Sequence, residues 1–416
     1  MSTVISRTLG SLRDNRPFRL LWYSNLFFFG GVWTQTLVLG WLAWDTTHSE
    51  FLVAVFGAVR LAPLLLGPFA GALADRHNRV RLLIIAAAWA LGVVSVIAML
   101  ASLGRASYGV LLAGALALGL AQSPSQPARA SLVLDLVGRQ NLSNANALNS
   151  MAINMTGVIS PALAGLMVNG IGAPATLWVS TIWYAVSLAL LVPLRGLGQV
   201  VHAHSGSALR MVVGGLRAIS RNRLASTVLL ITLGANIFLW PIAQSFMPVF
   251  ASSLGMGASG LGWLLTCAGV GGLLGSLVIA WLGDFPFKGG LFVVGTAVWG
   301  TLWALFAISR NPVVSFVLMG VIGVFSAAFG VLQTTLLLMT TEAPLHGRAL
   351  GVQELAIGVM PLTSLVIGAF AQRYGAASTT FVCGFLLVLV TVALGIWTRE
   401  LFRFGAPEPT NRRLRS

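Results

Sequence analysis

Charged side chains are scarce in this chain of 416 residues. They make up 8% of the sequence, whereas hydrophobic residues make up 57% and the mean hydropathy is +0.88. A soluble domain needs about 25% charged residues to cover its surface. The composition therefore excludes a soluble globular protein and indicates a chain that places most of its surface against lipid.

Acidic residues are the scarcest charged type. The sequence has 10 Asp and Glu against 25 Lys and Arg, which gives a net charge of +15. In a soluble chain this excess would suggest a nucleic-acid partner. Here the basic residues fall in short segments between apolar runs, where membrane topology explains them. We expect the lipid bilayer as a partner and no nucleic acid.

Cysteine is almost missing as well. The two cysteines, Cys267 and Cys383, lie far apart inside apolar runs, which excludes a disulfide framework. No His or Cys lies near a carboxylate within an apolar run, and no metal-ligand spacing occurs. We expect no metal, no cofactor and no enzymatic activity.

What the chain does contain is a series of long apolar runs. A helix needs about 20 apolar residues to cross a bilayer. Prolines are expected to break the fourth run, at Pro124 and Pro127, and the seventh, at Pro241 and Pro248. The twelve predicted membrane spans are 18–42, 51–73, 81–103, 108–128, 145–169, 175–194, 225–250, 259–282, 289–309, 313–335, 349–370 and 377–397.

The distribution of basic residues orients these spans. All but four of the 25 Lys and Arg residues fall on one side of the predicted membrane; the exceptions are Arg60, Arg105, Arg310 and Arg373. Because basic residues stay in the cytoplasm, we expect a multi-pass protein of the bacterial inner membrane with both termini cytoplasmic. The predicted units are an N-tail (1–17), a six-helix bundle (18–194), an amphipathic linker (195–224), a second six-helix bundle (225–397) and a C-tail (398–416).

A polar segment after the second span recurs in the other half. Asp75 and Arg79 have counterparts 209 positions later in Asp284 and Lys288. Other matched pairs lie at similar offsets, namely Asn25 with Asn236, Gln126 with Gln333, and Asp135 with Glu342. Such a parallel repeat of two six-helix units is one of the architectures that transporters use. The predicted fold is therefore an all-α polytopic protein of two pseudo-symmetric bundles.

The segment Gly71-Ala-Leu-Ala-Asp75-Arg76-His-Asn78-Arg79 resembles the signature loop of the major facilitator superfamily. The resemblance covers about 18–397 and extends to the drug, macrolide and siderophore exporters of that superfamily through Pro127-Ala-Arg129-Ala, Asn144-Ala-Asn-Ala-Leu-Asn149 and Gly347-Arg348-Ala-Leu-Gly351. It implies proton-driven efflux, so that the proton gradient is the energy source.

The same resemblance implies a cytoplasmic gate. Gly71 allows close helix approach, and Asp75 would face the positive N-terminus of the eleventh helix, near Ala349. Arg76 and Arg79 would hold Asp75 or bind lipid phosphate. The second copy, with Asp284 and Lys288, is expected to make a weaker gate. The alternative is a basic turn that only follows the topology rule.

The fifth span carries Gly157, Pro161 and Gly165. Their pattern is similar to a motif of antiporters, with serine in place of its first glycine. A proline kink with small residues lets helices bend and pack closely. Both an antiporter role and a plain packing kink remain open at this point.

Two charged residues fall inside predicted spans and away from the first residues of those spans, namely Arg60 and Glu354. Charges there are costly and mark functional candidates. Arg60 would bind an anionic substrate group, or else form a structural hydrogen bond with a polar helix residue such as Asn25 or Gln35. Glu354 would carry a coupling proton, or else pair with an arginine such as Arg348. The fourth predicted span has no arginine, although many proton antiporters of the superfamily have one there.

Polar and aromatic side chains of the first, fourth, seventh and tenth spans are the candidate walls of a substrate cavity. Amides and aromatics with few charges suit an amphipathic organic molecule; alternatively, several of them satisfy one another between helices. The candidates are Asn25, Trp33, Gln35, Gln122, Asn236, Trp240, Gln244 and Gln333.

The sequence thus favours a secondary active exporter of a small amphipathic molecule, expected to be a monomer. An importer of a small metabolite on the same scaffold and a non-transporting membrane sensor are the alternatives.

Overall fold

The computed structural model describes residues 15–66, 78–197, 216–217, 219–283, 285–342 and 345–405, apart from the side chains at 66, 139–141 and 143. Its described residues form α-helices and short 3-10 helices, with no strand among them. Nine of these helices are long and apolar enough to cross a membrane. The prediction of an all-α membrane fold is confirmed.

The N-terminal half consists of α3 (Arg16–Thr47), α4 (Glu50–Leu61), α6 (Arg79–Ser102) and α7 (Tyr108–Leu191), with 3-10 turns at Ala62–Leu66 and Val192–Leu194. The start of α3 is set by Asn15, whose side chain accepts from the Phe18 N–H at 2.9 Å. This cap satisfies one of the amide donors that a helix start leaves free.

Helix α7 holds three of the predicted spans in one continuous stretch. Only Gly138 (φ 68°) and Gly172 (φ 86°) leave helical geometry within it. Both angles are in the range that favours glycine, so these two positions are where the chain turns back. Because α7 combines three spans, the count of twelve crossings stays a prediction.

Prolines act differently in the two halves. The break expected at Pro241 and Pro248 is confirmed, since the chain forms α9 (Arg223–Phe238), α10 (Trp240–Ser245) and α11 (Met247–Ser253). The break expected at Pro124 and Pro127 is wrong, because both lie inside α7 with helical backbone. A helix in lipid keeps its remaining backbone hydrogen bonds around a proline, because the bilayer core has no water to bond with free N–H and C=O groups.

The rest of the C-terminal half is α12 (Gly257–Leu282), α13 (Lys288–Ile308), α14 (Pro312–Thr340), α15 (His346–Gly358), α16 (Met360–Tyr374), α17 (Ala376–Trp397) and α18 (Glu400–Arg403). Helices α15 and α16 correspond to one predicted span. They are separated at Val359, two residues before Pro361.

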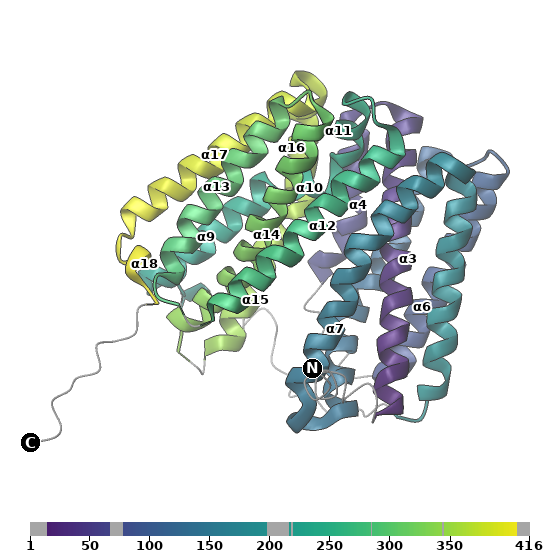
Figure 1. Ribbon diagram of the computed structural model, residues 1–416, viewed down its shortest axis with the longest axis horizontal. Helices are drawn as coiled ribbons and strands as arrows, with labels where there is room; N and C mark the ends of the chain where they lie inside the picture. Colours follow the sequence, from purple (N-terminus) through teal and green to yellow (C-terminus); the bar gives the residue numbers. More distant parts are fainter. Residues whose placement is uncertain are drawn as a thin grey trace, which may run out of the picture.

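Each half has its own packed interior. Helices α3 and α6 pack on α7 in the N-terminal half, while α12 packs on α14 and α13 packs on both α14 and α17 in the C-terminal half. The halves meet through α4 against α16 and α7 against α12. In Figure 1 they stand side by side, close together at the top and spread apart toward the bottom.

Two faces of the bundle are useful landmarks. The termini face is the one where α3 begins and α17 ends; the far face is the one where α3 ends and α4 begins. The predicted domain boundaries stay predictions. Most of the predicted amphipathic linker lies outside the described residues, which include only 195–197, 216–217 and 219–224 of it.

Candidate functional site

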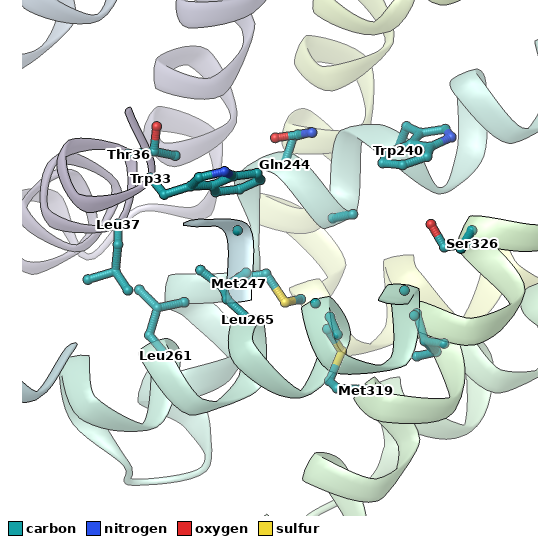
Figure 2. A pocket seen from close by; sticks show the side chains of 18 of the residues that line it. Trp33, Thr36, Leu37, Trp240, Gln244, Met247, Leu261, Leu265, Met319 and Ser326 are labelled. Carbon is teal, nitrogen blue, oxygen red and sulfur yellow. The ribbon is translucent and has the colours of Figure 1, made fainter. Parts of the chain in front are cut away.

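A cavity of about 470 Å³ lies between the two halves. Its walls come from α3, α4 and α7 on one side and from α10 to α14 on the other. Figure 2 shows Trp33 and Trp240 on either side of it, with Gln244 between them. Five of the residues singled out in the sequence line it, namely Trp33, Arg60, Gly157, Trp240 and Gln244.

Arg60 connects the two halves across this cavity. It lies in the last turn of α4 and donates from Nη2 to the Gln244 Oε1 on α10 at 2.8 Å. A second, longer contact joins its Nη1 to the Thr36 Oγ1 at 3.5 Å. Arg60 thus bonds to polar helix residues, as the structural alternative expected, but these are Gln244 and Thr36 rather than the examples Asn25 and Gln35.

The walls are mainly aromatic and aliphatic. Trp240 packs edge-on against Trp299, with ring centroids 5.7 Å apart, and Trp303 lies in the same wall. Gly157 lies against the Trp33 indole, since a Cβ added there would be 3.4 Å from the Trp33 Nε1. Such a lining, with a few polar groups, is typical of sites for organic ligands, and the volume lies within their usual range.

At the far face, hydrogen bonds join α4 to α16 and α17. The Ser49 Oγ and the Phe51 N–H both donate to the Gln372 Oε1, at 2.8 and 3.1 Å. The Ala376 N–H, at the start of α17, donates to the Glu50 Oε1 at 3.0 Å. Burial raises the pKa of Glu50 above its usual 4.5, and the bond from Ala376 opposes this to a smaller extent.

Close backbone packing joins α7 to α12. A Cβ added at Gly165 would lie 2.6 Å from the Ala258 carbonyl oxygen, and one added at Gly262 would lie 2.5 Å from that of Pro161. Deeper in, the Thr266 Oγ1 donates to the Val158 carbonyl at 2.9 Å. The predicted kink motif is thus part of the contact between the halves. Its antiporter role stays a prediction.

Known proteins share this architecture. A family model of the major facilitator superfamily, described as a transmembrane secretion effector, matches residues 7–406. The chain belongs to the major facilitator superfamily. As predicted, this major facilitator is a membrane transporter and not an enzyme.

Three relatives cover most of this major facilitator. The staphyloferrin A transporter of Staphylococcus aureus is 23% identical over 385 residues, 91% of this chain and 95% of the relative. The multidrug efflux pump Tap of Mycolicibacterium fortuitum is 24% identical over 389 residues, which are 90% of this chain and 94% of the relative. The enterobactin exporter EntS of Shigella boydii is 26% identical over 376 residues, 87% of each.

Solved structures support the fold. The peptide transporter POT in complex with alafosfalin has a TM-score of 0.77 at 10% identity, over 94% of this major facilitator and 95% of that chain. At this identity the likeness extends to the fold alone.

Five predicted cavity residues lie away from this cavity. Two of them bond elsewhere: Asn25 bonds to side chains of α7, and the Asn236 Nδ2 donates to the Thr232 carbonyl of its own helix at 2.8 Å. Spacing along a helix does not reveal which neighbour a polar side chain meets. The five are Asn25, Gln35, Gln122, Asn236 and Gln333.

Asn25 belongs to a second polar cluster, inside the N-terminal half. Its Oδ1 accepts from the Arg129 Nη1, and its Nδ2 donates to the Asn149 Oδ1. Arg129 is 2% exposed and lies over the Phe28 ring, 4.2 Å from its centroid. The prediction that only Arg60 and Glu354 carry charge inside the bundle is therefore wrong. Arg129 was missed because it follows Pro127, where the helix was expected to end.

Glu354, on α15, is exposed and has no hydrogen bond or ion pair with another described residue. The alternative in which it pairs with Arg348 is not seen. Its role as a proton carrier stays a prediction.

Part of the predicted gate lies outside the described residues, namely Gly71, Asp75, Arg76 and Asp284. Arg79, at the start of α6, is described and pairs with Asp135 of α7 at 2.5 Å. Asp135 was recognised in the sequence only as part of the repeat. The contacts expected for Arg79 with Asp75 or lipid phosphate stay predictions. Lys288 starts α13, with its Nζ 5.4 Å from the centroid of the Phe285 ring.

Proposed function

We propose that this major facilitator is a secondary active exporter that carries a small amphipathic organic molecule out of the cell by alternating access, driven by the proton gradient. The observation that carries the proposal is the cavity itself. Both halves build it, its walls are tryptophans and aliphatic side chains, and Arg60 and Gln244 meet across it. A molecule bound there would touch both halves and would respond to their relative movement.

The contacts at the far face suit such a movement. The contacts described there are single hydrogen bonds and glycine contacts, whereas the helices within each half pack on one another more extensively. The contacts can therefore break as the halves rock, without unfolding either half.

Export is favoured by the relatives, because two of them are described as an efflux pump and an exporter. Coupling to protons requires a carboxyl group whose protonation changes with conformation. Glu50 satisfies this requirement best among the described residues, because it lies in the contact between the halves and its Oε2 is buried without a partner. Glu354 is the second candidate.

The test is transport in everted membrane vesicles, in which an exporter accumulates substrate in the lumen. Rhodamine 123 and fluorescein are suitable probes, since both are amphipathic and share the xanthene ring system. We expect accumulation of at least one dye when a pH gradient is imposed, and its loss when nigericin collapses that gradient. Vesicles without the protein are the control.

Accumulation that survives collapse of the gradient would contradict proton coupling. Accumulation in right-side-out vesicles instead of everted ones would indicate an importer.

A further inference from the structure

The cavity contains one cation and no anion. Arg60 lines it, and among the described residues none of the other lining side chains carries a carboxyl group. The hydrogen bonds of Arg60 go to a neutral amide, Gln244, and to a neutral hydroxyl, Thr36. A guanidinium has five N–H donors, so most of its donors are left for another group.

An arginine in the apolar interior without a counter-ion is costly. The C-terminal end of α4 offers some compensation, because Arg60 lies in its last turn and the carbonyl end of a helix is partly negative. That partial charge is about half of an elementary charge and acts only over the last turn. It does not replace an anion that meets the guanidinium with two oxygens.

The Arg60 guanidinium is also within reach of a bound molecule. Arg60 is partly exposed and lines the cavity. Arg129 provides the contrast, because it is buried against the Phe28 ring and its Nε and Nη2 atoms are buried without hydrogen-bond partners. The two arginines share a charge, but only Arg60 is placed to bind a ligand.

We propose that the cavity takes an organic anion, whose carboxylate, phosphate or sulfonate oxygens replace the Gln244 amide oxygen on Arg60 while its apolar body lies between Trp33 and Trp240. This rests on the proposed transport function and specifies its substrate class. The exchange is favourable because an anion supplies the missing counter-charge and can meet the guanidinium with two oxygens in parallel, whereas Gln244 offers one neutral oxygen.

The exchange also links binding to movement. The Arg60–Gln244 hydrogen bond joins α4 of one half to α10 of the other. An anion that takes the place of Gln244 removes this link and substitutes its own contacts. Binding of an anion thereby loosens the contact between the halves at the cavity. A neutral or cationic molecule competes less well with Gln244 for Arg60 and so loosens this contact less.

The test compares fluorescein and rhodamine 123 on the purified full-length protein in detergent, by fluorescence anisotropy at neutral pH. The dyes share a ring system but differ in charge, fluorescein being anionic and rhodamine 123 cationic. We expect fluorescein to bind more tightly, and Arg60→Gln to weaken its binding about tenfold to a hundredfold, the usual effect of losing a charge-assisted bond. Arg60→Lys should keep part of the preference.

Gln244→Glu is the sharper variant, because it keeps the shape of the side chain and gives Arg60 a permanent counter-ion. We expect fluorescein binding to fall about tenfold or more, while rhodamine 123 binding stays or improves. Gln126→Glu is the matched control, since Gln126 is exposed and does not line the cavity. It should leave both affinities within about twofold.

Equal binding of fluorescein by the wild type and Arg60→Gln would overturn the anion site, as would tighter binding of rhodamine 123 by the wild type. Transport separates this proposal from the previous one. If fluorescein binds through Arg60 but neither dye accumulates in vesicles, export fails and the anion site stands. If rhodamine 123 accumulates and fluorescein neither binds nor accumulates, export stands and the anion site fails.

Discussion

Arg129 and Arg60 lie in the same half of the protein, but their surroundings differ. Arg129 is enclosed within the N-terminal half by Asn25 and Phe28. Arg60 reaches across a cavity to Gln244 of the C-terminal half. The first contact stabilises one half, whereas the second can break while both halves stay folded. Burial alone therefore does not distinguish the two arginines; their position relative to the contact between the halves does.

The glycines of α12 make the same distinction. A Cβ at Gly271 would lie 1.8 Å from the Gly320 carbonyl oxygen of α14, within the C-terminal half. Gly262 faces α7 of the other half, near Pro161 and Gly165. Helix α12 thus uses small residues on one side to pack within the C-terminal half and on the other side to contact the N-terminal half.

The largest expected effect is that of Asn25→Leu. The substitution leaves the Arg129 guanidinium buried without its Asn25 acceptor, and an unsatisfied buried donor costs about 1–3 kcal/mol, with a larger cost when the donor is charged. We expect a marked loss of folded protein and a lower unfolding temperature in detergent.

Gln244→Leu is the matched control, because it removes the acceptor of Arg60, which remains accessible from the cavity. Its cost should stay near the value for an ordinary hydrogen bond, about 1 kcal/mol. Equal destabilisation by the two variants would break the comparison between the two arginines.

Gly165→Val comes next. The added side chain meets Ala258 and Gly262 of α12, and such overpacking costs about 1–3 kcal/mol. Since the strain lies between the halves, we expect parting of the far face rather than unfolding. The measurement is labelling of Ser326→Cys, in a chain lacking Cys267 and Cys383, by an impermeant thiol reagent added at the far face.

Labelling should be faster in Gly165→Val than in Gly170→Val, because a Cβ at Gly170 meets nothing within 4 Å. Gly271→Val should instead lower the unfolding temperature, since its strain lies within one half. Equal labelling rates in Gly165→Val and Gly170→Val would contradict the idea that the α7–α12 contact closes the far face.

Asp75→Asn tests the predicted gate at the termini face. Removal of the charge should weaken its attraction to a helix N-terminus, which is worth about 0.3–1 kcal/mol at exposed sites and up to about 2 when partly buried. We expect transport to fall severalfold with expression unchanged. Asp45→Asn, at an exposed position near the far face, is the control. Normal transport by Asp75→Asn would leave the segment as a basic turn.

The smallest effect is expected for Glu50→Gln. Because burial raises the Glu50 pKa, the protonated form of Glu50 stabilises the far-face contact. This contribution is fully present below pH 4.5 and is lost as the pH rises through the raised pKa. Glutamine mimics the neutral form, so the variant should keep this contribution at neutral pH. Glu50 is only partly buried, and the effect should stay below about 1 kcal/mol.

The measurement is the unfolding temperature against pH for the wild type and the variant. A wild-type curve that falls with acidification relative to Glu50→Gln would contradict the sign of this shift.

Much of the fold could be read from the sequence, because the length of an apolar run is a local property. The runs at 81–103 and 377–397 correspond to α6 and α17, and the seventh run breaks at its two prolines as expected. The helix through Pro124 and Pro127 could not be read in this way. Whether a proline ends a membrane helix depends on how its neighbours satisfy the freed backbone groups.

The candidate site was recovered in part. Four residues that were predicted separately line one cavity, namely Trp33, Arg60, Trp240 and Gln244. Asn25 and Asn236, which occupy matched positions in the repeat, bond within their own halves. Their sequence signal was the same as that of Gln244, so the pattern could not separate them.

The sequence by itself determined that this protein is a membrane transporter of two related halves, because apolar length, basic-residue bias and repeated motifs each depend on short stretches of chain. Tertiary structure alone decided that Arg60 faces Gln244 while Arg129 is sealed beside Asn25. The reason is physical: a polar residue's partner depends on how each helix is rotated and on how the halves pack, and neither is set by the local order of residues.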